Sequence, residues 1–195
     1  MSSQLSGFEA LFFGRIDYQD RALRQNQSNL EHIWRGSPSV GSRGQTFTDV
    51  IPGYGPPGGM CWDQAGCGST APWQDDPTLE EYNVPAYVNF TVTTARNWAQ
   101  NYLKESDGTV HIMWTMGSDF QYVNAQHWYK NLDRMIAYTN VNTSTHGVNV
   151  FYSHPSAYAE AKLAAADLTW TVKTDDYFPY CDASTSPTHP RSHFT

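Results

Sequence analysis

The sequence contains few basic residues. Lysine and arginine together number 12 among 195 residues, against 19 aspartates and glutamates, which gives a formal net charge of −7. Because a nucleic-acid binder neutralises phosphates with clustered cations, this balance argues against a nucleic-acid partner. Hydrophobic residues make up 39% of the chain, which is typical of a globular domain with a core. Tyrosine and tryptophan are frequent, which suits core packing and also the aromatic faces of sugar-binding clefts.

Long apolar runs are also missing. No run approaches the roughly 20 residues that cross a bilayer as a helix, so we expect no membrane span. The first residues, MSSQLSGFEALFF, lack the basic start and the apolar middle of a secretory signal peptide, and we expect none in this chain. Three N-x-[S/T] sequons, at Asn26, Asn89 and Asn142, are weak evidence for secretion.

Hydrophobic patterning predicts strands and helices in alternation. The expected strands are residues 10–14, 110–116, 148–152 and 168–172, and the expected helices are residues 18–34, 85–104, 123–137 and 156–166. Residues 37–83 are dense in Gly, Pro, Ser and Asp, and are interpreted as a long ordered loop or as a linker between domains. Strands separated by helices favour a parallel sheet with right-handed crossovers, so the predicted fold class is α/β.

The chain is organised around residues 109–122, TVHIMWTMGSDFQY. The first half is apolar apart from His111 and Thr115, as expected for a strand covered on both faces. Gly117 ends the apolar run, and Asp119 follows on the turn. A carboxylate at the carboxyl end of such a strand lies where α/β proteins place their chemistry. The alternative interpretation is that Asp119 caps the helix that follows.

Five stretches carry a resemblance to a known family. They are FFGRIDYQD from Phe12, GYGPPGGMCWD from Gly53, HIMWTMGSDFQY from His111 followed by NAQHWYKNLDRMI, NVFYSHPSAY from Asn149, and LTWTVKTDDYFPY from Leu168. In this order they resemble glycoside hydrolase family 38, the α-mannosidases, and the lysosomal type most closely. The resemblance spans roughly residues 7–180. It implies part of a parallel (β/α) barrel-like catalytic domain, with too few strand units here to close a barrel.

The resemblance implies a retaining α-mannosidase that hydrolyses terminal α-mannose from glycans. In the family, the aspartate that matches Asp119 is the general acid/base, and the positions that match Arg15 and Asp63 line the sugar pocket. Taken from the residues alone, a structural salt bridge or a loop hydrogen bond explains Arg15 and Asp63 as well as a place in the sugar pocket does. The implied partners are mannose-containing glycans, and the implied location is the lysosome, the vacuole or the outside of the cell.

Two parts of the family's catalytic machinery do not occur in these residues. The family's nucleophilic aspartate belongs to an Asp-Pro-Phe-Gly-His motif shortly before the part that matches residues 12–20, and the sequence has no such motif. The family's zinc is bound by a His-x-Asp pair, the nucleophile and a later histidine, yet none of the seven histidines here is followed two residues later by aspartate. We expect zinc in the complete family enzyme, no metal ligands in this chain, and no activity of this chain alone.

The resemblance also implies a disulfide and a domain boundary. Lysosomal members carry a disulfide at the pair that matches Cys61 and Cys67, and Cys181 is left over. Residues 1–182 are interpreted as part of the amino-terminal catalytic domain. Residues 183–195 lack both apolar periodicity and the family's aromatic continuation, so we expect a disordered tail unrelated to the family.

Three interpretations of the function stay open at this point. The first is a fragment of an α-mannosidase catalytic domain. The second is a non-catalytic carbohydrate-binding protein that keeps pocket residues without the nucleophile, and mannose binding by the chain alone would favour it. The third is an inert product of a truncated gene, which aggregation on expression would favour.

Overall fold

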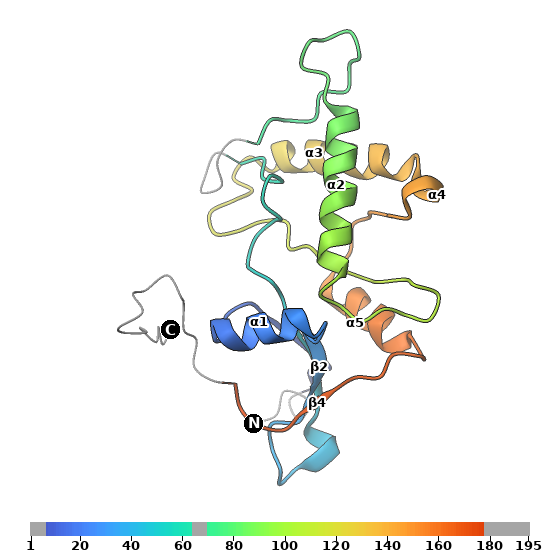
Figure 1. Ribbon diagram of the computed structural model, residues 1–195. Coiled ribbons are helices and arrows are strands. Elements are labelled where there is room, and N and C mark those ends of the chain that lie inside the picture. Colours follow the sequence, from blue (N-terminus) through green and yellow to red (C-terminus); the bar gives the residue numbers. More distant parts are fainter. Residues whose placement is uncertain (1–6, 64–69, 178–195) are drawn as a thin grey trace. The chain divides into compact units, whose positions relative to one another are not determined.

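The computed structural model describes residues 7–63 and 70–177, and Figure 1 shows its helices and strands. The chain forms two compact units, and each is described by itself. Unit 1 comes from Met1–Gly53, Ala99–Ile112 and His154–Thr195, and unit 2 comes from Tyr54–Trp98 and Met113–Ser153, within the described ranges.

Unit 1 is built on a four-stranded sheet with the strand order β1-β3-β2-β4. The strands are β1 (Ala10–Phe13), β2 (Glu31–Trp34), β3 (Thr46–Val50) and β4 (Val172–Lys173). β1 pairs with β3 in parallel, β2 with β3 antiparallel, and β2 with β4 in parallel. The fold is therefore α/β, as predicted, but the sheet is mixed rather than parallel, and the structure does not confirm a barrel.

The predicted helix over residues 18–34 is wrong in its second half. Helix α1 (Tyr18–Asn26) starts where expected, because the Asp17 carboxylate accepts hydrogen bonds from the backbone N–H groups of Gln19 and Asp20. The helix ends at Asn26, and strand β2 follows. The apolar residues after the helix suited a helical stripe, but they pair instead with strands that are distant in the sequence, and such pairing overrides a local periodicity.

Of the expected strand over residues 168–172, only Val172 belongs to a strand, β4. Two other expected strands, residues 110–116 and 148–152, do not form in the part of the chain that the structure describes. Both stretches are at most half-buried, whereas the prediction required burial on both faces. In the second stretch the Asn140 side chain replaces a neighbouring strand: its amide nitrogen donates to the Val150 carbonyl (2.7 Å), and its oxygen accepts from the Val150 N–H (2.9 Å). An apolar run forms a strand only where backbone partners lie alongside it.

The other helices agree with the prediction to within five residues at each end. They are α2 (Val84–Ala99), α3 (Ala125–Asn140) and α5 (Pro155–Ala164), and the structure adds the short helices η2 (Gly41–Gly44) and α4 (Thr143–His146). Pro155 occupies the first turn of α5, as expected from its fixed φ angle. Within the described ranges, none of the helices has the length and apolarity needed to cross a bilayer.

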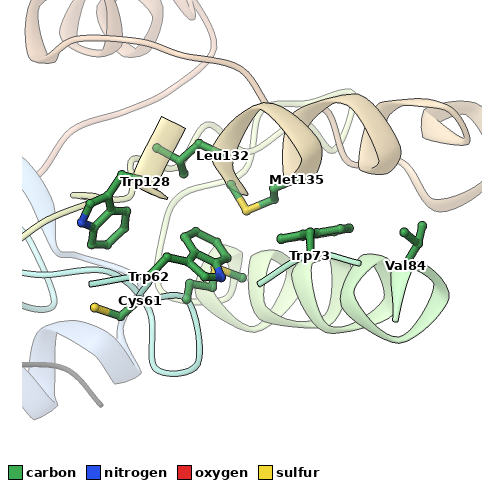
Figure 2. Close-up of a cluster of buried hydrophobic side chains, with 8 residues drawn as sticks. Cys61, Trp62, Trp73, Val84, Trp128, Leu132 and Met135 are labelled. Atoms are coloured by element: carbon green, nitrogen blue, oxygen red, sulfur yellow. The ribbon is translucent and has the colours of Figure 1, made fainter. Parts of the chain in front are cut away.

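The core of unit 2 is aromatic. Trp73 and Trp128 are fully buried, and Figure 2 shows them with Trp62, Leu132 and Met135. The Trp62 and Trp128 rings meet edge to face, with centroids 5.8 Å apart. Because Trp62 comes from the Gly- and Pro-rich stretch before α2, this part of that stretch is an ordered loop and not a linker.

Unit 1 buries two carboxylates beside one lysine. Asp49 of β3 is completely buried, lies opposite Glu31 of β2 in the sheet register, and neither of its oxygens has a hydrogen-bond partner among the described residues. Burial and, secondly, the charge of Glu31 raise the pKa of Asp49 well above 3.8, while Lys162 on α5 acts in the opposite direction. The Asp49 charge also helps to raise the pKa values of the nearby Tyr102 and Tyr158.

We predict that Asp49→Asn makes unit 1 more stable than the wild type, and that this difference in stability grows as the pH rises. An acid whose pKa is raised by folding contributes stability below its unfolded pKa, and this contribution disappears as the pH rises through the folded pKa. Asparagine carries no charge, so the melting temperature of the variant should exceed that of the wild type at pH 7, and the gap should close toward pH 4.

The melting temperatures of the variant and the wild type must be compared with each other at each pH, because the contribution of His32 to stability changes with pH in the opposite direction. Burial lowers the pKa of His32 to about 4, so its contribution is lost as the pH falls from about 6.5 toward 4. That contribution is common to both proteins and cancels in the difference between their melting curves. A difference that does not change with pH would contradict the prediction for Asp49.

Candidate active site

Asp119 is exposed on a tight turn of unit 2. The turn is closed by a hydrogen bond from the Gln121 N–H to the Ser118 carbonyl (3.3 Å). Helix α3 begins only at Ala125, and Asn124 occupies its N-cap position. The interpretation of Asp119 as the cap of this helix is therefore wrong. Asp119 is instead exposed on the surface of unit 2.

The backbone on both sides of Asp119 adopts unfavourable conformations. Gly117 has φ 153°, Phe120 has φ 62° and Tyr122 has φ 67°. Residues with side chains rarely adopt a positive φ, at a cost on the order of 1–3 kcal/mol each. A Cβ atom at Gly117 would lie only 2.8 Å from the Tyr122 ring, so this position requires glycine. The turn is thus held in place by its contacts rather than by local backbone preference.

Asp63 supplies two of these contacts. Its Oδ2 accepts a hydrogen bond from the Tyr122 N–H (2.8 Å) and another from the Trp128 indole N–H (2.9 Å). The Tyr122 and Trp128 rings stack with centroids 4.8 Å apart, at 14° to each other. On the other side of the turn, the Tyr122 hydroxyl donates to the Met116 carbonyl. Burial raises the pKa of Tyr122, so this hydroxyl remains a donor.

Two further contacts join the turn to the loop that precedes Asp63. The Thr115 hydroxyl donates to the Gly55 carbonyl (3.1 Å) and accepts from the Gly55 N–H (3.2 Å). The Gln121 side-chain amide donates to the Cys61 sulfur at 3.6 Å. Residues 54–63 and 113–122, which are distant in the sequence, therefore lie side by side in unit 2.

The predicted site residues are divided between the two units. Asp63 and the turn that carries Asp119 belong to unit 2. Arg15 belongs to unit 1, where it is exposed directly after β1. Cys61 is buried in unit 2, but Cys67 lies outside the described residues, so their disulfide stays a prediction.

Sequence reasoning did not find the roles of Tyr122 and Trp128. Trp128 lies in the core of unit 2, but nothing in the local pattern indicates that its indole N–H binds Asp63. No spacing rule pairs a carboxylate with donors this far along the chain, so the contact follows only from the tertiary structure.

The described residues do not fit a zinc site. Among residues 7–63 and 70–177, no three His, Cys, Asp or Glu side chains lie close enough together to hold a metal ion. The chemistry that this part of the chain offers is that of a positioned, exposed carboxylate.

Comparison with known proteins identifies the family. Residues 2–183 match the glycosyl hydrolases family 38 N-terminal domain. The chain belongs to glycosyl hydrolase family 38. This confirms the resemblance that the sequence motifs carry.

Curated relatives agree with this membership. The chain is 47% identical to an α-mannosidase of Arabidopsis thaliana over 90% of its own length and 16% of the relative. It is 43% identical to the lysosomal α-mannosidase of Felis catus over 90% of its length and 17% of the relative. It is 44% identical to the α-mannosidase of Canavalia ensiformis, with the same coverage of 90% and 17%. The chain thus spans about one sixth of the length of these relatives.

Proposed function

We propose that this chain is a segment of the catalytic domain of a retaining α-mannosidase, which removes terminal α-mannose from glycans in a lysosome or vacuole. The observation that carries the proposal is the placement of Asp119. In a chain of family 38, this carboxylate is exposed at the tip of a turn whose flanks are tied down by hydrogen bonds. An exposed group can reach a substrate, and a tied turn keeps that group in one position.

Asp119 acts as the general acid/base in the proposed reaction. A retaining glycosidase needs two carboxyl groups about 5–5.5 Å apart, one of which attacks the sugar while the other protonates the departing oxygen. Asp119 gives its proton to that oxygen in the first step and takes a proton from water in the second. The sequence contains no Asp-Pro-Phe-Gly-His motif, so the nucleophile is proposed to come from outside these 195 residues.

The proposal also includes roles for the other residues that the family resemblance singles out. Arg15 is proposed to donate hydrogen bonds to sugar hydroxyls, and the Asp63 carboxylate is proposed to accept one. A disulfide between Cys61 and Cys67 would fix the loop that contacts the turn, in keeping with an oxidising compartment. Zinc is proposed for the complete enzyme, with ligands outside this segment. Residues 1–182 are proposed to belong to the catalytic domain and residues 183–195 to an unrelated tail.

The test compares a complete protein that carries this segment with the 195-residue chain. The complete protein should hydrolyse an aryl α-mannoside at acid pH with retention at the anomeric carbon. The chain alone should neither turn over this substrate nor bind stoichiometric zinc, because catalytic groups that act as a unit leave no proportionate partial activity. Product stereochemistry is followed by NMR, and zinc is titrated by calorimetry.

Other outcomes would replace the proposal. Mannose binding by the complete protein without hydrolysis would favour a carbohydrate-binding protein. Zinc-dependent turnover by the 195-residue chain would mean that another carboxylate, such as Asp17 or Asp176, serves as the nucleophile.

A further inference from the structure

We propose that Asp63 is a positioning residue, whose carboxylate holds the Asp119 turn against the core of unit 2. The family resemblance implies that Asp63 lines the sugar pocket. The geometry points to a second task, carried out through the turn rather than through the sugar. The consequence for catalysis rests on the proposed function of Asp119, whereas the contact itself does not.

The hydrogen bonds of Asp63 join a strained turn to a rigid element. One oxygen accepts from the Tyr122 N–H, which belongs to the turn, and from the Trp128 indole, which belongs to α3. Trp128 is completely buried and packs edge to face against Trp62. Its position is therefore determined by the core, and Asp63 transmits that position to the backbone three residues after Asp119.

The Tyr122 side chain alone does not provide this link. Its hydroxyl binds the Met116 carbonyl, so it closes the turn upon itself. Its ring stacks on Trp128, but stacked rings can slide at little cost, whereas two hydrogen bonds to one charged oxygen fix both direction and distance. Removing Asp63 would also leave the fully buried Trp128 indole without this acceptor, a loss that favours rearrangement of the turn.

Placement of Asp119 matters because proton transfer requires hydrogen-bond distance to the departing oxygen. A displacement of about 1 Å at a reacting group can lower the rate by about 100-fold. A variant that loosens the turn should therefore reproduce part of the defect of a variant that lacks the acid. It should do so most for substrates that depend on protonation.

The first measurement is made on the 195-residue chain and requires no activity. Hydrogen–deuterium exchange of the peptide that contains residues 117–122 is compared in the wild type, Asp63→Asn and Asp63→Leu. Leucine has a similar size but no acceptor, and exchange of the Tyr122 amide should accelerate about 10- to 100-fold. Asparagine keeps a neutral acceptor, and exchange should accelerate only about 5-fold.

The matched control is Asp133→Asn together with Asp133→Leu. Asp133 also accepts a hydrogen bond from an aromatic side chain of unit 2, the Tyr152 hydroxyl at 2.8 Å, and this hydrogen bond does not involve residues 117–122. Its variants should leave exchange in residues 117–122 unchanged. If Asp63→Leu fails to fold, the 5-fold effect of Asp63→Asn decides the matter. Wild-type exchange in Asp63→Asn and in any folded Asp63→Leu would overturn the proposal.

The second measurement is kinetic and uses a complete protein that carries the segment. Asp63→Leu should lower kcat/KM for a mannoside with a poor leaving group by up to about 100-fold, and should affect an activated aryl mannoside much less. Asp63→Asn should restore most of the loss. An equal rise in KM for both substrates, with kcat unchanged, would assign Asp63 to sugar binding alone and overturn the positioning role.

The two measurements separate this proposal from the proposed function. If Asp119→Asn shows no dependence on the leaving group, the acid/base assignment fails, and faster exchange in Asp63→Leu still establishes the link to the turn. If Asp119→Asn behaves as an acid/base variant but exchange is unchanged in the Asp63 variants, the positioning role alone is overturned.

Discussion

Replacing Lys162 with methionine is expected to lower the free energy of unfolding of unit 1 by about 3–5 kcal/mol at pH 7. Lys162 of α5 and Glu31 of β2 are each only 1% exposed, and the lysine Nζ lies 2.7 Å from a Glu31 oxygen. The lysine also donates to the His111 carbonyl (3.1 Å). Methionine fills similar space but leaves the Glu31 carboxylate buried without its cation. Domains of this size are stable by only about 5–15 kcal/mol, so unit 1 should be close to unfolding.

The cost should come from the unpaired charge and not from lost packing. The double variant Lys162→Met with Glu31→Gln removes both charges of the pair and should recover most of the stability, since an apolar or neutral replacement of a buried pair is often nearly neutral. Burial raises the pKa of Glu31, so the loss in Lys162→Met should also be smaller at acid pH, where Glu31 takes up a proton. Urea denaturation at pH 5 and pH 7 measures both effects.

The matched control is Lys173→Met. Lys173 lies 2.8 Å from Asp175, almost the same distance, but the Asp175 side chain is 80% exposed. Solvent screens such a pair, so its loss should be far less damaging. If Lys162→Met destabilised unit 1 no more than Lys173→Met, the prediction that the loss of the buried Lys162–Glu31 pair is the more damaging change would be wrong.

The helices could be predicted from the sequence because their signals are local. Asp17 before α1 and Pro155 at the start of α5 act within one turn, and the apolar stripe of α3 needs only its own spacing. The sheet could not be predicted in the same way. β2 and β3 exist because Ile33 lies opposite Phe47, with a register that involves residues far apart in the sequence. Conversely, residues 110–116 have the composition of a buried strand, but the described structure does not place them in a ladder.

The candidate site also combines local features, which the sequence predicts, with tertiary contacts, which it does not. The position of Asp119 after Gly117 is a local property, and Gly117 with φ 153° is where the apolar stretch ends. The hydrogen bonds of Asp63 to Tyr122 and Trp128 join residues that are far apart in the sequence, and hydrophobic periodicity does not predict them. The sequence therefore locates the candidate acid/base residue, Asp119, but not the contacts that hold its turn.

Replacing Asp119 with asparagine should lower the rate for a natural-type mannoside by about 100- to 10,000-fold in a complete protein that carries this segment. Asparagine has nearly the same size, so the turn should keep its hydrogen bonds, but the amide cannot give a proton to the departing oxygen. An activated aryl mannoside needs little protonation, so its first chemical step should be affected much less. Steady-state and burst kinetics with both substrates measure the difference.

The same variant should respond to an external nucleophile. In a retaining mechanism the acid of the first step is the base of the second, so Asp119→Asn should accumulate the glycosyl-enzyme formed from an activated substrate. Azide needs no general base, and adding it should raise turnover and give an α-mannosyl azide. The control is Ser118→Ala, which changes the same exposed turn without removing a carboxylate and should respond neither to the leaving group nor to azide. Equal losses for both substrates in the first step, with no effect of azide, would show that Asp119 is not the acid/base.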